Sequence, residues 1–238
     1  MRGLHRSVAI VMAVAGISEA FIAHAQSARS STVPAAASTI SQKGTTMPSR
    51  NASDLLAALI PASCQLVSQR SVVVDGESAQ LTRYERKDGR NAGLEGEHFS
   101  TVVAADGTLK GFANISLDLA GKPLPSRERT ETIARAFLQS HAPELLPRMQ
   151  ISWIEPHDEP IRVQRDGRSE TVTLTGMKVK ARNLADGRWF WVIVGSDERP
   201  MVFERDIVWI TFPGHRKTEK WLHDSWLKAQ PAQTARQV

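Results

Sequence analysis

Asp-Gly pairs recur along the chain, and their repetition constrains the fold more than any other feature of the sequence. Aspartate and glycine tolerate the positive φ angles that tight β-hairpin turns require, so an Asp-Gly pair between two strand-like runs predicts a hairpin. Most of the pairs lie between runs rich in Val, Thr, Phe or Trp: Asp75-Gly76, Asp88-Gly89, Asp106-Gly107, Asp166-Gly167 and Asp186-Gly187. The sequence therefore predicts an antiparallel meander.

The runs between these turns predict strands over residues 72–74, 79–86, 98–105, 108–117, 149–154, 170–182, 188–194 and 201–209. One long helix is predicted between the two strand groups, at 126–141, where Ser126 provides a cap and Glu128 and Glu131 are acids that the helix dipole favours in the first turns. Shorter helices are predicted at 53–60 and 219–228, the second packing on the sheet or fraying.

Antiparallel strands with one main packed helix indicate an α+β fold, with a short helix near the C-terminus. A helix followed by about four strands occurs twice in the predicted order, at 53–120 and 126–228. These two segments are expected to form an α+β domain over 53–228, with the hypothesis that its halves are related by duplication.

The N-terminal 25 residues have the pattern of a removable secretory signal. A positive start is followed by the apolar run 8–17 and by Ala23-His24-Ala25, a small-residue cleavage site. The apolar run is about half of the roughly 20 residues that cross a bilayer, so an uncleaved anchor is the weaker alternative. We expect a periplasmic or secreted protein without an integral membrane span after cleavage, with a disordered linker at 26–52 and a flexible tail at 229–238.

Composition excludes several classes of protein. The chain has 238 residues, of which 41% are hydrophobic and 23% charged, close to the averages of globular domains. Its formal net charge of +5 is spread without a run of five or six like charges, which gives no reason to expect a nucleic-acid partner. The single cysteine, Cys64, excludes an intramolecular disulfide and is expected to be a small buried hydrophobe.

The passage from Thr101 to Leu138 resembles PepSY-like exported domains. It contains a strand pair of the type D-G-x-L-x-G-F at 106–112, followed by a helix start of the type S-x-E-x-x-x-x-I-A at 126–134. The resemblance extends over about 101–210 and implies a PepSY- or cystatin-like layer of one helix against a small curved antiparallel sheet. It also implies a binding role, since such modules accompany secreted proteases as inhibitory or folding segments or stand alone in the periplasm.

All six tryptophans lie in the C-terminal half of the chain. On an extended strand Trp189 and Trp191 point to one face and Phe190 to the other, so both faces of this strand are apolar. Two interpretations follow: Trp221 and Trp226 cover this surface as ordinary core, or it stays open and binds a ligand or partner.

Glu204-Arg205-Asp206 interrupts the neighbouring strand, where Arg205 is expected to point to the same face as Phe203. An arginine on an apolar face needs an acidic partner or marks an anion contact, and both readings stay open. The predicted binding residues are Trp189, Trp191, Phe203, Arg205 and Trp209.

A metal or acid-base site is the alternative. Histidine and carboxylate ligands suit zinc, and His157, Asp158 and His223 are its candidate ligands, with Glu155, Glu159, His215 and Asp224 as further members. Against this, Pro156 and Pro160 predict a surface turn, and no H-x-x-x-H or H-E-x-x-H spacing is present.

Other catalytic motifs are missing. The sequence has no G-x-S-x-G elbow, no phosphate-binding loop and no dinucleotide-binding glycine pattern. We therefore expect no cofactor and a non-enzymatic module that binds a protein or peptide partner in the cell envelope. A secreted metal-dependent hydrolase and a structural envelope protein are the alternatives.

Overall fold

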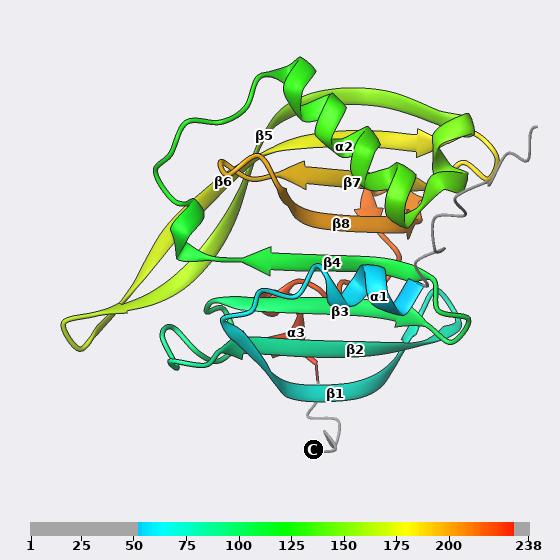
Figure 1. The fold of residues 1–238 in the computed structure, drawn as a ribbon. Helices are drawn as coiled ribbons and strands as arrows, with labels where there is room; N and C mark the ends of the chain where they lie inside the picture. Colours follow the sequence, from blue (N-terminus) through cyan, green and yellow to red (C-terminus); the bar gives the residue numbers. More distant parts are fainter. Residues whose placement is uncertain (1–51, 231–238) are drawn as a thin grey trace, which may run out of the picture. The chain divides into compact units, whose positions relative to one another are not determined.

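One eight-stranded antiparallel sheet organises the structure, a computed structural model that describes residues 52–230 (Figure 1). The strands lie in the order β1-β2-β3-β4-β8-β7-β6-β5. Their bounds are β1 (Cys64–Val74), β2 (Glu77–Arg86), β3 (His98–Ala104), β4 (Leu109–Ile115), β5 (Met149–Arg165), β6 (Arg168–Asn183), β7 (Trp189–Val194) and β8 (Pro200–Ile207), and a separate small hairpin pairs β9 (Trp209–Ile210) with β10 (His215–Arg216).

The large sheet consists of two successive four-stranded meanders that share one seam. Strands β1 to β4 form the first meander and β5 to β8 the second, and β4 pairs with β8. The seam has three residue pairs, Gly111 with Glu204, Phe112 with Phe203 and Ala113 with Val202. Because every neighbouring pair is antiparallel, short turns connect most strands within each meander.

The helices lie on two faces of the sheet. Helices α1 (Ala52–Ala57) and α2 (Arg127–His141) lie on what we call the front face, and α3 (Asp224–Lys228) lies on the opposite, back face (Figure 1). Two 3-10 segments, η1 (Leu117–Leu119) and η2 (Pro143–Arg148), flank α2 in the chain. Phe137 of α2 packs on Phe112 and Phe203, with ring centroids 5.5 and 5.1 Å apart. Buried apolar side chains form one cluster on each face of the sheet.

The prediction of an α+β fold with one main packed helix is wrong, because the fold is mainly β. Strands account for 49% of the structure and helices for 19%. The predicted strands are all present, but β1 and β5 are much longer than their apolar runs, and the two meanders merge into one large sheet. The helix predicted at 126–141 is present as α2, whereas the helix predicted at 219–228 is reduced to α3.

The prediction of a surface turn at 155–160 is also wrong, since these residues lie in the middle of β5. β5 is an edge strand, and an edge strand tolerates proline because a missing N–H on its outer side breaks no ladder. Pro156 pairs with Met177 and Pro160 with Thr173 across β6. Proline therefore marks the strand as an edge instead of ending it.

Four of the five Asp-Gly pairs close β-hairpins, as predicted. Asp75-Gly76 and Asp166-Gly167 form two-residue turns in which all four residues have positive φ. Asp88-Gly89 differs, because it opens the long loop 87–97 between β2 and β3. That loop contacts the far end of the sheet: the N–H of Arg162 donates to the carbonyl of Glu95 at 2.7 Å.

Several predictions concern residues outside the described range. These are the signal at 1–25, the linker at 26–52 apart from its last residue, and the tail beyond 230. Within 52–230, no helix has both the length and the apolarity to cross a membrane. Cys64 is half-buried at the start of β1, so the expectation of a buried thiol is wrong.

Gly111 provides a test of the seam between the meanders. A Cβ at this position would lie 2.5 Å from the Phe203 carbonyl oxygen and 2.8 Å from Cδ1 of Leu222, so β8 would have to move. We expect Gly111→Ala to lower the free energy of unfolding in urea by about 1–3 kcal/mol. Asn114→Ala, in the same strand but just outside the three seam pairs, is the control, and equal losses for both variants would contradict the close approach.

Candidate functional site: a tryptophan and cation surface

Cations and tryptophans alternate on the back face where β5, β6 and β7 lie side by side. Lys178, Lys180 and Arg182 occupy every second position of β6, so they share one face. Lys180 is paired with Trp153 of β5 and Trp191 of β7, and Arg182 is paired with Trp189. Direct cross-strand partners point the same way, so the pairing gathers these side chains on one surface.

Lys180 lies among three tryptophan rings. Its Nζ is 4.6 Å from the ring centroid of Trp189, 5.5 Å from that of Trp153 and 5.6 Å from that of Trp209. Within the described residues Lys180 forms no ion pair, so the ring faces are its electrostatic partners. Trp209 belongs to β9, which follows β8 and thereby brings the C-terminal segment to this surface.

Trp191 has a different environment, because it is buried. Lys178 Nζ lies 4.1 Å from the centroid of its ring, and the guanidinium carbon of Arg216 lies 5.6 Å from it. Burial lowers the pKa of the Lys178 amine to about 8. The core interpretation therefore holds for Trp191, which belongs to one buried cluster with Trp221, while Trp226 packs against that cluster. Trp221 is held in place by donating its indole N–H to the carbonyl of Val73 in β1.

A buried carboxylate holds the C-terminal segment over Trp191. Glu204 of β8, with a side chain only 4% exposed, lies 2.7 Å from Arg216 and 3.0 Å from Nε2 of His223. Burial alone would raise the pKa of Glu204, but the positive charges and hydrogen bonds of His223 and Arg216 outweigh it and hold this pKa far below its ordinary value. Burial lowers the pKa of His223, but the negative charge and the hydrogen bond of Glu204 have the larger effect, so this pKa is raised.

A second buried carboxylate holds the start of α3. Asp224 accepts two hydrogen bonds from Arg83 of β2, at 2.8 and 3.1 Å, and a third from the N–H of Glu95 at 2.5 Å. The pKa of Asp224 is lowered, because the charges of His98 and Arg83 outweigh its burial. Glu204 and Asp224 thus attach residues 216–224 to both meanders, in a segment where only Arg216 is paired with another strand.

The outer part of the surface is accessible. Trp209 is 47% exposed, Phe212 in the turn between β9 and β10 is 90% exposed, and Trp153 and Trp189 are half-buried. Arg182 is exposed and donates only to the carbonyl of Gly187 among the described residues. We call Trp153, Lys180, Arg182, Trp189 and Trp209 the tryptophan–lysine surface; it presents aromatic rings with unpaired positive charge.

The five predicted binding residues do not form one surface. Trp189, Trp191 and Trp209 lie on the back face, whereas Phe203 is fully buried under α2 on the front face. Arg205 also lies on the front side, where it pairs with Glu144 of η2 and with Asp206. The structural salt bridge is therefore the reading of Arg205 that the structure favours.

The three candidate metal ligands do not converge. His157 lies 3.3 Å from Glu159 on the back face, while Asp158 points to the other face and accepts a hydrogen bond from Thr175. His223 is engaged by Glu204. Among residues 52–230, no group of three or more His, Cys, Asp or Glu side chains is arranged to hold a metal ion.

Sequence reasoning missed the cations and Trp153. The pattern Lys178-Val-Lys180-Ala-Arg182 carries a period-two signal that places three charges on one strand face, and it lay inside a correctly predicted strand. No comparable signal exists for Arg216, because it reaches Trp191 from the separate two-residue strand β10. Its role depends on the tertiary fold.

Comparisons with protein-family models, curated proteins and solved structures give no match to this chain. The resemblance to PepSY-like domains therefore stays a hypothesis about ancestry, and the function has to be argued from the surface itself.

The pair of Glu204 and His223 predicts a pH dependence of stability. A raised folded-state pKa means that the stabilisation by His223 is complete below its ordinary pKa of 6.5 and is lost as the pH rises through the raised value. We expect the free energy of unfolding to fall between about pH 6.5 and about pH 8, where Lys178 begins to titrate. Urea titrations of the wild type and of Glu204→Gln measure this slope; an equal slope in the variant would contradict the pairing.

Proposed function

We propose that this chain is an exported binding protein whose tryptophan–lysine surface holds an acidic, partly apolar segment of a partner protein or peptide. The observation that carries the proposal is Lys180, a cation among three tryptophan rings without an ion pair in the described part of the chain. Export is supported by the charge, apolar run and cleavage pattern of residues 1–25.

Charge and shape support an acidic partner. Lys180 and Arg182 leave positive charge unpaired, so a carboxylate from a partner would find a cation in a partly desolvated site. Tryptophan and arginine are the side chains most often responsible for binding energy at protein interfaces. The rings of Trp189 and Trp209 offer apolar contact area between these charges, which suits a segment that alternates carboxylates with aliphatic side chains.

The structure also makes the surface rigid before a partner arrives. Trp153 and Trp189 stand on paired strands, and Trp209 follows the buried strand β8 directly. A preformed surface loses little conformational entropy on binding, which favours affinity. No observation gives comparable support to a metal-dependent hydrolase, because His157, Asp158 and His223 do not meet.

A pair of charge-reversed peptides tests the proposal. The probes are a peptide of about 12 residues that alternates leucine with glutamate, and the same peptide with lysine in place of glutamate. We expect the acidic peptide to bind and to quench tryptophan fluorescence, and Trp209→Ser or Lys180→Gln to weaken its binding roughly tenfold, as the loss of about 1.4 kcal/mol would.

Matched controls distinguish binding at this surface from non-specific binding elsewhere on the protein. Leu66→Ser removes another exposed apolar side chain, on β1, and Arg165→Gln removes another exposed cation, at the tip of the β5–β6 hairpin. Both should bind the acidic peptide like the wild type. Equal binding of the lysine peptide, or binding only to vesicles of anionic lipid, would overturn the proposal.

A further inference from the structure

The turn between β9 and β10 carries the most exposed large apolar side chain among residues 52–230. Phe212 in this turn is 90% exposed, whereas the next of these side chains, Leu184, is 57% exposed. All four residues of the turn, 211–214, are exposed, so the phenyl ring stands at the tip of a short hairpin. One exposed apolar side chain is common on a protein surface, so Phe212 by itself does not mark a binding surface.

The charge of the hairpin is a second, independent observation. Residues 207–218 contain no aspartate or glutamate, but they contain Arg216 and Lys217. Lys217 is exposed and forms no ion pair within the described part of the chain. The next acid along the chain, Glu219, accepts a hydrogen bond from the N–H of Asp75 at 2.8 Å, so it is held at the β1–β2 turn. The hairpin therefore combines an apolar tip with positive charge that no neighbouring carboxylate balances.

The strand pairing places a cation on each side of the hairpin. Trp209 is paired with Arg216, and Arg216 lies over Trp191, so this face of the hairpin is turned toward the large sheet. On that face Nζ of Lys180 lies 5.6 Å from the ring centroid of Trp209. Side chains alternate along a strand, so Lys217, which follows Arg216, points to the opposite face. The apolar tip thus lies between Lys180 on one side and Lys217 on the other.

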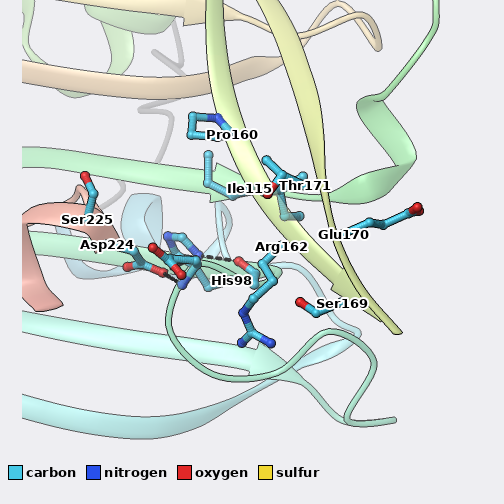
Figure 2. A pocket seen from close by; sticks show the side chains of 12 residues that line it. His98, Ile115, Pro160, Arg162, Ser169, Glu170, Thr171, Asp224 and Ser225 are labelled. Carbon is cyan, nitrogen blue, oxygen red and sulfur yellow. Dashed lines mark hydrogen bonds and ion pairs between the residues drawn. The ribbon is translucent and has the colours of Figure 1, made fainter. Parts of the chain in front are cut away.

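Hydrogen bonds and an ion pair hold the base of the hairpin and the segment that follows it. The N–H of Val208 donates to the hydroxyl of Thr218 at 2.8 Å, and the N–H of Lys217 donates to the carbonyl of Val208 at 2.9 Å. Figure 2 shows Asp224, which anchors the following segment, beside His98 at the wall of a cavity. The tip is therefore presented by a preformed base, so little conformational entropy is lost when it is bound.

We propose that the tip of the β9–β10 hairpin inserts into the surface of an anionic lipid bilayer. Phe212 enters the boundary between headgroups and acyl chains, Trp209 lies at the interface, where tryptophan is enriched, and Lys217 contacts the anionic headgroups. A strand rises about 3.4 Å per residue, which places Lys217 roughly 7–10 Å from the tip, and amphipathic elements enter this boundary to a depth of about 5–10 Å. The proposal is independent of the proposed partner, because Phe212 and Lys217 lie outside the tryptophan–lysine surface.

Sedimentation with vesicles tests the proposal on the chain in its exported form, and every variant carries the same N-terminus. The vesicles consist of equal parts of phosphatidylglycerol and phosphatidylcholine, or of phosphatidylcholine alone. We expect binding to the anionic vesicles that is at least about tenfold tighter than binding to the neutral ones. Phe212→Ser should weaken binding to the anionic vesicles about tenfold and Lys217→Gln about fivefold. Absence of wild-type binding to the anionic vesicles, or unchanged binding of Phe212→Ser, overturns the proposal.

Two control variants and the acidic peptide separate this binding from the proposed partner binding. Leu184→Ser removes another exposed apolar side chain and Lys122→Gln another exposed lysine, and both should bind the vesicles like the wild type. Without lipid, Phe212→Ser should bind the acidic peptide like the wild type. A loss of peptide binding in Phe212→Ser would assign the turn to the partner site and overturn the lipid proposal. Failure of the wild type to bind the peptide would contradict only the proposed partner, because the vesicle measurement does not depend on it.

Discussion

Two buried carboxylates, Glu204 and Asp224, determine how the last part of the described chain lies on the sheet. Residues 216–224 have almost no strand pairing to hold them, so the ion pairs with Arg216, His223 and Arg83 replace the missing backbone ladder. A buried carboxylate that loses its partner is strongly destabilising, so such pairs tolerate few alternative arrangements. The position of this segment in turn determines which tryptophans are buried.

The arrangement separates the tryptophans into two roles. Arg216 and Lys178 lie over Trp191, which becomes core, while Trp209 leaves the sheet at the end of β8 and stays 47% exposed beside Lys180. The same segment reaches the first meander, where Asp224 pairs with Arg83 of β2. The proposed partner surface therefore depends on how the C-terminal segment after β8 is held on the sheet.

Local chemistry made much of the fold predictable from the sequence. Asp75-Gly76 and Asp166-Gly167 form the turns that their backbone preferences indicate, and Ser126 caps α2 by accepting from the N–H of Arg129. The fold class was wrong because the β4–β8 seam and the edge position of β5 are long-range facts. The alternation of side chains along a strand correctly placed Trp189 and Trp191 on one face. The burial of Phe203 under α2, and the position of Lys178 and Arg216 over the ring of Trp191, arise only from the tertiary fold.

Hydrogen exchange measured by mass spectrometry tests most directly whether Glu204 and Asp224 hold residues 216–224 on the sheet. The account predicts that the peptide covering 216–224 in the wild type is protected from exchange, well above an exposed turn such as 166–167. In the double variant Glu204→Gln and Asp224→Asn this protection should be lost, while β7 and α2 stay protected. Free exchange of 216–224 in the wild type, or unchanged protection in the double variant, would contradict it.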